Sequence, residues 1–381
     1  MYKESEQYVT RVQEYILAHN LIAENNTLII GLSGGPDSVF LLHVLAHLRS
    51  FFKLNLIAAH LDHGWRDNSA DDVEFCKRIA AHYDVEFISA HAHDSKHQHK
   101  YNGSREDMGR MLRRTFFENL AERYQAHAIA LGHHADDNNE TFFLRLIRGS
   151  GISGLACMRP RDGIYIRPLL CMRKHEILEF LHKHNQEYLT DSTNNSTVFL
   201  RNSIRKNALP VLETIDPRFA ANLNRTINNL AQTDLFLEQL TQKTYGSLVA
   251  DGACPHSLDT NSSRYSLGMS GETARGECPT KPDISSHSAS LVFDQFMHLD
   301  PYMQKRILEL FFINNKAHFV PSENFYKEIF KFLNSSATRH ELHTTWALVK
   351  KNNKLSIEHI NGEKHMDYVH NKNATTCLEH E

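Results

Sequence analysis

The stretch Thr27-Leu-Ile-Ile-Gly-Leu-Ser-Gly-Gly-Pro-Asp-Ser38 decides the fold of this 381-residue chain. It opens with a short apolar run and closes with a loop of small and polar residues. The apolar run 39–48 that follows predicts a helix, so a buried strand leads through a glycine loop into a helix N-terminus. This order of elements is typical of an anion site, because the helix dipole and the loop N–H groups face a phosphate together.

The loop residues have the chemistry that a bound phosphate needs. Gly34 and Gly35 have no Cβ and let the backbone approach a ligand, while two serine hydroxyls add donors. Asp37 is the unusual member, since a carboxylate repels phosphate unless it holds Mg²⁺ or caps the helix. No lysine precedes the last serine, so the loop is not a Walker A motif, and an ordinary strand-to-helix turn remains the alternative. The phosphate-facing set is Ser33, Gly34, Gly35, Pro36, Asp37 and Ser38.

Composition limits the class of protein. Hydrophobic residues make up 41% of the chain and charged residues 23%, which is typical of a globular protein. The net charge of -3 means that any nucleic-acid surface must be local. The six cysteines stand singly without a CxxC pair, which favours a reducing cytoplasm over a disulfide framework or a cysteine metal site. The polar, acidic start and the lack of a long apolar stretch predict neither signal peptide nor membrane span.

The first half of the chain alternates between strand and helix patterns. Strands are predicted at 27–32, 54–60, 85–90 and 127–132, and helices at 2–20, 68–83 and 104–124. This alternation predicts an α/β fold, a doubly wound, Rossmann-like parallel sheet with helices on both faces. Ligands bind such sheets at the carboxyl ends of the strands. The segments 33–38, 60–66 and 132–140 should therefore converge.

The second half predicts a mainly helical domain. The domain boundary is placed between residues 216 and 217, with domains 1–216 and 217–360. Within the second domain we predict helices over 218–248, 291–312 and 321–333, and a hairpin over 343–359 that turns at Asn352-Asn353. Residues 249–290 are rich in Ser, Gly, Pro and Thr and indicate a low-complexity insertion, and 361–381 a disordered tail.

Polar residues follow two of the predicted strands. His60 and Asp62 lie just past the second strand and are predicted to face the bound ligand, with an ordinary polar loop as the alternative. After the fourth strand come Asp136, Asp137 and Glu140, which can hold Mg²⁺ or orient an amine nucleophile. His133 can donate to phosphate or act as a base. The alternative is helix capping, which is compatible with catalysis.

Arginines form three clusters. Arg110, Arg113 and Arg114 are three and four residues apart, so they share one helix face. Arg148 follows Arg145, and Arg201 precedes Arg205 by one helical turn. In a chain of negative net charge these clusters favour contact with polyphosphate or an RNA backbone, unless they are merely solvated. The four histidines within His91–His99 are interpreted as an exposed loop rather than a metal site.

Together these motifs resemble the tRNA(Ile)-lysidine synthetase family of the PP-loop (SGGxDS) ATP pyrophosphatase superfamily. The match covers about residues 1–216, and Leu299–Arg306 is the best local match beyond it. The chain departs from the family at Asn138, where glutamine is common, and at Gly109, where alanine is usual. The insertion 249–290 is unusual, and the further C-terminal domain of the longest members is not matched. The matching stretches are Ser33–Ser38, Leu61–Arg66, Arg110–Arg114, His133–Thr141, Arg148–Leu155, Arg167–Leu170, Asp191–Asn194 and Arg201–Arg205.

The resemblance implies a reaction that uses ATP and Mg²⁺. ATP adenylates O2 of cytidine 34 in the CAU anticodon of tRNA(Ile), and the ε-amine of free L-lysine then attacks C2 and expels AMP. Codon specificity changes from AUG to AUA. We predict Asp37, His133 and Asp137 as catalytic. The alternatives are a tRNA 2-thiocytidine synthetase-like enzyme, which needs paired cysteines, and a non-catalytic tRNA-binding protein. The oligomeric state stays open, with a homodimer among the options.

Overall fold

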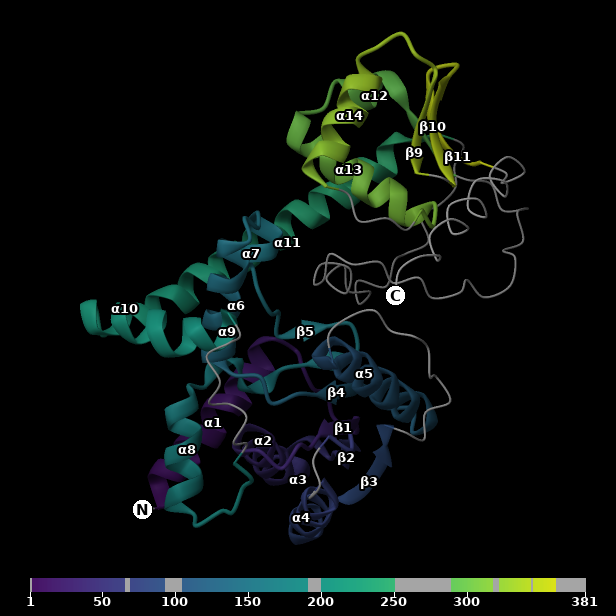
Figure 1. The fold of residues 1–381 in the computed structure, drawn as a ribbon. Helices are drawn as coiled ribbons and strands as arrows, with labels where there is room; N and C mark the ends of the chain where they lie inside the picture. The colour runs from purple at the N-terminus through teal and green to yellow at the C-terminus, as the bar shows by residue number, and fades with distance from the viewer. Residues whose placement is uncertain are drawn as a thin grey trace, which may run out of the picture. The chain divides into compact units, whose positions relative to one another are not determined.

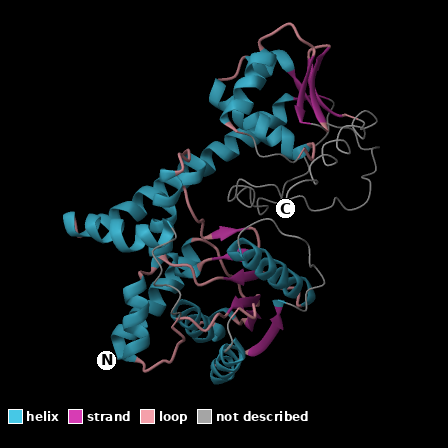
Figure 2. Cartoon of the chain, viewed as in Figure 1, coloured by secondary structure: helices cyan, strands magenta, loops and turns pink. Residues whose placement is uncertain are grey.

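The computed structural model describes residues 2–65, 69–92, 105–190, 200–250, 289–317, 322–343 and 345–360 (Figures 1 and 2). Among them the chain divides into two compact units within one long helix, after Leu235. The predicted domain boundary between residues 216 and 217 is a different division of the chain, and it stays a prediction. Most of the predicted insertion 249–290, the whole tail 361–381 and residues 93–99 of the histidine-rich segment lie outside the described residues.

The first unit is built on a six-stranded sheet with the order β3-β2-β1-β4-β6-β5. All neighbouring strands are parallel except β5 and β6, which form a short hairpin. In the register, Leu28 of β1 lies between Leu56 of β2 and Ala128 of β4. The predicted parallel α/β sheet is confirmed, while the β5–β6 hairpin was not predicted. The strands are β1 (Thr27–Gly31), β2 (Asn55–Asp62), β3 (Glu86–His91), β4 (Ala128–Ala130), β5 (Arg161–Asp162) and β6 (Tyr165–Ile166).

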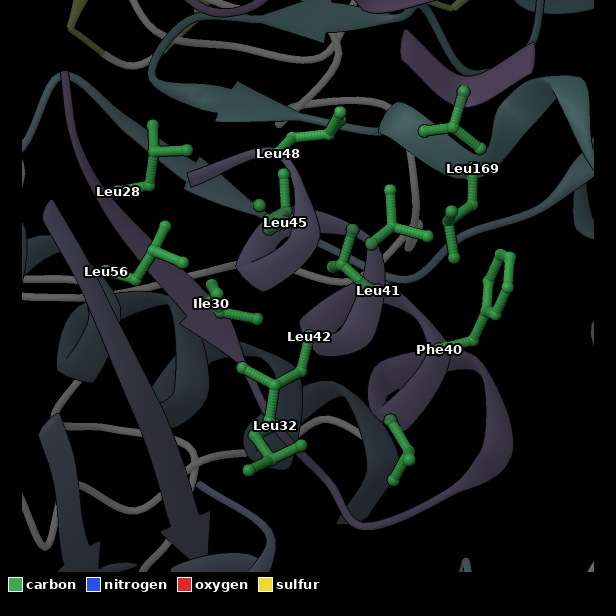
Figure 3. Packing of buried hydrophobic residues seen from close by; sticks show 14 of the residues in the cluster. Leu28, Ile30, Leu32, Phe40, Leu41, Leu42, Leu45, Leu48, Leu56 and Leu169 are labelled. Atoms are coloured by element: carbon green, nitrogen blue, oxygen red, sulfur yellow. The ribbon is translucent and has the colours of Figure 1, made fainter. Parts of the chain in front are cut away.

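Helices cover both faces of this sheet. Leu28 and Ile30 of β1 pack with α2 on one face, as Figure 3 shows, whereas Ile29 packs with Phe117 of α5 on the other. β1 therefore has a continuous apolar run, because it is buried on both sides. The helical elements are α1 (Tyr2–Ala18), α2 (Pro36–His47), α3 (Arg49–Phe52), α4 (Ser69–His82), α5 (Arg105–Arg123), α6 (Ala135–Ile147), α7 (Ile152–Leu155), η2 (Pro168–Cys171), α8 (Lys174–Lys183), α9 (Leu200–Ser203), η4 (Ile204–Ala208), α10 (Leu209–Ile215) and α11 (Phe219–Leu248), which continues into the second unit.

The second unit combines helices with a five-stranded antiparallel sheet of order β7-β8-β11-β10-β9. The predicted hairpin is confirmed as β10–β11. Its turn residues Asn352 and Asn353 have φ of 50° and 56°, the left-handed values that a two-residue hairpin turn requires. The elements are β7 (Val249–Ala250), β8 (Ser290–Val292), α12 (Phe293–Met297), α13 (Pro301–Asn314), α14 (Glu323–Leu333), β9 (Arg339–His343), β10 (Trp346–Lys351) and β11 (Lys354–His359). No helix in the described part of the chain is long and apolar enough to cross a membrane.

A partly buried histidine, His43, links α2 to Tyr83, the residue after α4, in the first unit. The Tyr83 hydroxyl donates to Gln186 Oε1 at 2.8 Å, so its oxygen accepts from His43 Nδ1 at 3.0 Å. Burial lowers the pKa of His43 to about 4, and the nearby His47 and His184 add to the effect. His43 is therefore neutral in the folded protein at pH 7, whereas in the unfolded chain it takes up a proton near pH 6.5.

The unfolded state binds more protons at this position, so the free energy of unfolding should fall as the pH drops from 6.5 towards 4. We predict a loss of about 2 kcal/mol from His43 between pH 7 and pH 5. Urea denaturation at the two pH values measures it. His43→Gln should flatten the dependence by that amount, and the exposed His175→Gln should not. An unchanged pH dependence in His43→Gln would show that His43 does not carry the effect.

Candidate functional site

The loop after β1 folds around the side chain of Ser38. The backbone N–H of Ser33 donates to Ser38 Oγ at 3.1 Å, and that hydroxyl donates to the Gly35 carbonyl at 2.9 Å. Gly34 has a φ of +79°, and a Cβ there would lie 2.6 Å from Leu189 Cδ1. Only glycine meets both conditions without strain. No side chain caps the N-terminus of α2, so its first N–H groups are open to an anion.

The end of β4 lies directly against this loop. A Cβ on Gly132 would lie 3.1 Å from the carbonyl carbon and oxygen of Asp37 and 3.2 Å from the Ser38 nitrogen. Backbone therefore meets backbone at this point. The structure thus brings 33–38 and the segment after β4 together at the carboxyl edge of the sheet, as the parallel topology predicts.

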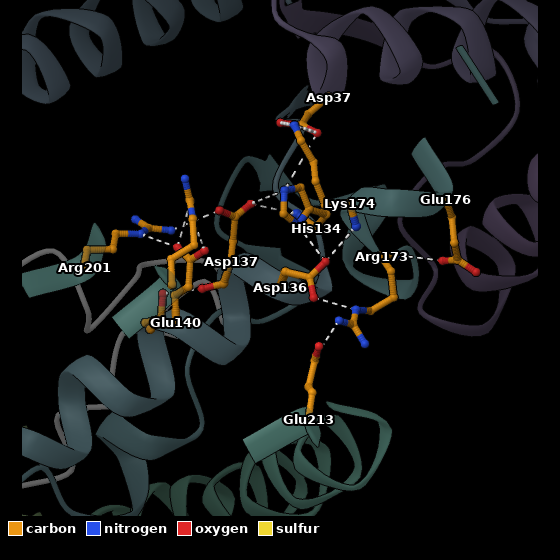
Figure 4. Close-up of polar contacts among 12 residues, drawn as sticks. Asp37, His134, Asp136, Asp137, Glu140, Arg173, Lys174, Glu176, Arg201 and Glu213 are labelled. Atoms are coloured by element: carbon orange, nitrogen blue, oxygen red, sulfur yellow. Dashed lines mark hydrogen bonds and ion pairs between the residues drawn. The ribbon is translucent and has the colours of Figure 1, made fainter. Parts of the chain in front are cut away.

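His134 lies at the centre of the acidic residues (Figure 4). Its Nε2 is 3.8 Å from Asp37 Oδ1 and 3.4 Å from Asp137 Oδ2, and its Nδ1 is 3.8 Å from Asp136 Oδ2. The His134 backbone N–H donates to Asp137 Oδ2 at 3.0 Å, so Asp137 also caps α6. Only 4% of His134 is exposed. Asp137 therefore caps α6 and also lies in the cluster of acidic residues around His134.

Lys174 is a site residue that the sequence analysis missed. Its Nζ lies 2.6 and 2.7 Å from the two carboxylate oxygens of Asp37, and its backbone N–H donates to Asp136 at 2.7 Å. The neighbouring Arg173 contacts Asp136 at 2.5 Å and Glu213 at 2.7 Å. A signal was present in the sequence: two basic residues at the start of a helix oppose its dipole, and such a placement favours a role outside the helix.

Two arginines hold the buried carboxylate of Glu140, of which 2% is exposed. Arg205 makes a two-point contact, with its Nε 2.5 Å from Oε1 and a terminal nitrogen 2.9 Å from Oε2. Arg201 contacts Oε2 at 2.8 Å and Asp137 Oδ1 at 3.0 Å. Hydrogen bonds to Glu140 raise the pKa of Arg205. Both arginines were predicted to contact tRNA or phosphate, and here they bind the acids of α6.

His60 and Asp62 at the end of β2 bind partners within the protein. His60 Nδ1 lies 2.8 Å from the Leu32 carbonyl and so ties β2 to the strand that leads into the loop. Asp62 accepts from Gly64 N–H at 2.8 Å and Ser69 Oγ at 3.0 Å, and His91 lies 2.9 Å away. Burial alone would raise the pKa of Asp62, but these bonds outweigh it and lower the pKa. Both residues therefore shape the edge of the sheet near the loop.

The remaining predicted arginines lie on α5 and at the end of α6. Arg113 lies 3.4 Å from His63 Nε2. Arg114 instead pairs with Glu118 at 2.8 Å and lies over the Tyr165 ring. Arg110 and Arg148 are exposed. The α5 arginines thus divide between two neighbourhoods rather than acting as one cluster.

Sequence comparison assigns the first unit to a protein family. The model of the PP-loop domain family matches residues 3–212, more than half of the chain. The chain belongs to this family. Its PP-loop is the Ser33–Ser38 loop described above.

Curated proteins with named functions are also similar in sequence to this chain. The tRNA(Ile)-lysidine synthase of Bacillus cereus is 33% identical over 238 residues, which is 61% of this chain and 50% of that protein. That of Clostridium tetani is 36% identical over 234 residues, 60% of this chain and 49% of that protein. The chain thus spans about half the length of the curated relatives it matches. Among solved structures, the U34-tRNA thiolase NcsA from Methanococcus maripaludis shares the fold, with a TM-score of 0.51 and 18% identity over 60% of this chain and 80% of that one.

Electrostatics sets the protonation of the PP-loop site. Burial alone would raise the pKa of Asp137, but His134, His133 and Arg201 together lower it, so Asp137 is anionic at neutral pH. Burial lowers the pKa of His133 to about 4, against the opposing pull of Asp137. His133 is therefore neutral at pH 7 and can accept a proton or donate its N–H.

The acids of the PP-loop site suit Mg²⁺ brought with a nucleotide. Within the described ranges no three His, Cys, Asp or Glu residues are grouped to hold a metal ion by themselves. Mg²⁺ commonly needs only one or two carboxylates, with phosphates and waters as its other ligands. Asp37 supplies such a carboxylate inside the loop, 29% exposed at its side chain. The donor set therefore fits a phosphate-bound Mg²⁺ and does not fit a metal cage made by protein alone.

Glu140→Leu tests whether the arginine contacts stabilise the fold. Removing this buried carboxylate takes away the carboxylate that Arg205 contacts and leaves Arg201 with Asp137 alone. Because both guanidinium groups are also partly exposed, we predict a loss of about 3 kcal/mol, at the low end for such pairs. Urea denaturation measures it. The matched control is Glu74→Leu, whose pair with Lys77 is exposed and should change stability by less than about 0.5 kcal/mol. Equal stabilities for the two variants would contradict the prediction.

Proposed function

We propose that this chain is a tRNA(Ile)-lysidine synthetase, a ligase that consumes ATP and joins lysine to C2 of cytidine 34 in the CAU anticodon. The observation that carries the proposal is the meeting of Asp37 and Lys174 at the PP-loop, directly beside His134 and Asp137. Cations, hydrogen-bond donors and carboxylates gathered at one loop support a role in binding the phosphates of ATP. The relatives named tRNA(Ile)-lysidine synthase support the choice of substrate.

The first step is transfer of AMP to the tRNA. The O2 of cytidine 34 attacks the α-phosphorus of ATP, the bond to the bridging oxygen breaks, and pyrophosphate leaves. The loop N–H groups and the Ser33 hydroxyl bind the phosphates, the Ser38 hydroxyl holds the loop in shape through Gly35, and Lys174 adds a cation beside Asp37. Asp37 would hold Mg²⁺, which shields the triphosphate charge.

The second step joins lysine and releases AMP. The neutral ε-amine attacks C2, the C2–O2 bond breaks, and the amine loses a proton. The neutral His133 can accept that proton, but its pKa of about 4 makes it a weak base for this step. Asp137 is the better candidate to hold a lysine ammonium, because it is anionic and only partly paired, whereas two arginines already neutralise Glu140. Asp136 is held by Arg173 and the Lys174 N–H and instead positions α8.

RNA contact would involve the exposed Arg110, Arg113 and Arg148. Arg201 and Arg205 would contribute by fixing the acids of α6, or by exchanging Glu140 for a phosphate when tRNA binds. An anticodon base must be unstacked to be read, and arginines are suited to hold the backbone around it.

A tRNA thiolase is the runner-up function, because such enzymes share the PP-loop fold. The sequence has no CxxC pair. Burial raises the pKa values of Cys76, Cys157 and Cys171 to about 12, which makes them poor thiolate nucleophiles. These observations favour the ligase. A non-catalytic tRNA-binding protein is the third reading, and it would form neither AMP nor pyrophosphate.

The proposal is tested by measuring AMP and pyrophosphate formation from ATP with lysine and CAU-anticodon tRNA(Ile), each omitted in turn. We expect AMP release only when both are present. Release that needs a sulfur donor instead of lysine would favour a thiolase, and no release under any condition would favour a binding protein.

Asp37→Asn should abolish AMP formation while the protein stays folded, because the amide neither pairs with Lys174 nor binds Mg²⁺ well. Lys174→Met should lower kcat/KM for ATP by roughly a hundredfold, the usual effect of losing one donor at a developing charge. Lys183→Met, at the other end of α8, is the matched control and should keep wild-type kinetics. Near-wild-type turnover in either site variant would remove these residues from the mechanism.

Asp137→Asn separates catalysis from capping. The asparagine oxygen can still accept from the His134 N–H, so thermal stability should change by no more than about 1 kcal/mol. Loss of the charge should leave ATP binding intact but stop adenylation or lysine transfer in single-turnover experiments. Asp71→Asn, in the first turn of α4, is the control for an acidic residue at a helix start. If the Asp137→Asn variant were less stable but fully active, Asp137 would act only as a helix cap and not in catalysis.

A further inference from the structure

An aromatic pair lies at the carboxyl end of β2, apart from the residues assigned so far. His63 and Trp65 stack, with ring centroids 4.6 Å apart and planes inclined by 25°. Trp65 is 38% exposed, so part of the indole reaches solvent although one side is occupied by His63. β2 lies beside β1 in the sheet, and β1 leads into the PP-loop. The pair therefore sits on the ligand-binding edge of the sheet.

Gly109 of α5 forms a slot for the indole. A Cβ at this position would lie 2.5 Å from Trp65 Cη2 and 3.0 Å from Cζ2. The indole ring is rigid, so an added methyl group could be accommodated only by moving the whole ring. Glycine inside a helix costs roughly 1 kcal/mol relative to alanine. The helix thus gives up stability at a position where the indole ring touches it.

The surroundings of the pair are basic. Arg113 lies one helical turn after Gly109 on the same face of α5 and is 3.4 Å from His63 Nε2. Burial, with the charge of Arg113, lowers the pKa of His63 to about 4, so the ring beneath Trp65 is neutral at pH 7. In the part of the chain that the structure describes, no carboxylate pairs with Arg110 or Arg113. An oriented aromatic surface beside such arginines suits a base with its phosphate.

We propose that Trp65, backed by His63 and seated on Gly109, is a stacking platform for an unpaired RNA base, with Arg113 contacting the adjoining phosphate. The identity of the RNA rests on the proposed function, in which the substrate is a tRNA whose anticodon loop has unstacked bases. A protein partner fits less well, because the arginines beside the indole would face an apolar interface. A base held on Trp65 is presented at the same edge of the sheet as the PP-loop.

Fluorescence tests the platform directly, because the chain has only two tryptophans. Trp346 is the other tryptophan and belongs to β10 of the second unit. The substitution Trp346→Phe therefore leaves Trp65 as the sole tryptophan emitter. Titration with an anticodon stem–loop RNA carrying CAU should quench the emission, as stacked bases do. An unchanged emission at saturating RNA, with binding confirmed by anisotropy of labelled RNA, would overturn the proposal. Quenching by ATP alone, and none by RNA, would overturn the assignment to RNA.

Variants test the geometry. Trp65→Leu should weaken stem–loop binding by roughly 5- to 150-fold, the range for one lost base–aromatic stack, and Trp65→Phe should lose less. ATP binding should not change. Gly109→Ala should weaken RNA binding as Trp65→Leu does, because it displaces the indole, and the double variant should lose no more than either single one. Additive losses would show that Gly109 does not act through Trp65.

Lysidine formation by the wild-type protein is measured in parallel. If the wild type forms no lysidine but Trp65→Leu weakens RNA binding, the proposed function fails and the platform stands. If the wild type forms lysidine and Trp65→Leu has an unchanged KM for tRNA, the platform fails and the function stands.

Discussion

The close approach of β4 to the PP-loop is the constraint on which the site depends. Gly132 lies so near the backbone of Asp37 and Ser38 that a side chain would have to displace main-chain atoms, which cannot swing aside as a side chain can. This contact aligns the start of α6 with the start of α2. Two helix N-termini then face the same space, and both dipoles favour an anion there. Because Gly132 has no side chain, the backbone that leads into α6 can approach the loop this closely.

Charge balance determines how the acids are arranged. Asp37 is paired with Lys174, Asp136 with Arg173, and Glu140 with Arg201 and Arg205. Each cation comes from a residue that follows α6 in sequence, so the chain must return to α6 and the PP-loop at Arg173 and Lys174 and again at Arg201 and Arg205. Carboxylates this close together would repel each other in a partly desolvated site without these partners. The cations therefore permit a concentration of acids in a small space, and in the function that we propose these acids would serve Mg²⁺ and an ammonium group.

Local patterns explain what the sequence could predict. The glycine loop, the apolar strands and the acids after β4 are each encoded within a few residues, and parallel topology then brings the strand ends together. The missed features depend on distant pairs. Lys174 meets Asp37 across 137 positions and Arg205 meets Glu140 across 65, and no periodicity records such contacts. The β5–β6 hairpin has strands of two residues each, too short for an alternating pattern. The sequence shows Gly109 as a departure from the family, but only the structure gives a physical reason for glycine there, because the Trp65 ring packs against this position.

In the function that we propose, this site joins lysine to a cytidine of tRNA. Mass spectrometry of the nucleosides from CAU-anticodon tRNA(Ile), after incubation with the protein, ATP, Mg²⁺ and lysine, tests it most directly. The account predicts that cytidine 34 gains the mass of lysine less one water, and that isotopically labelled lysine shifts this product by the label. A cytidine 34 of unchanged mass in the presence of folded, ATP-binding protein, or one that gains sulfur instead, would contradict it.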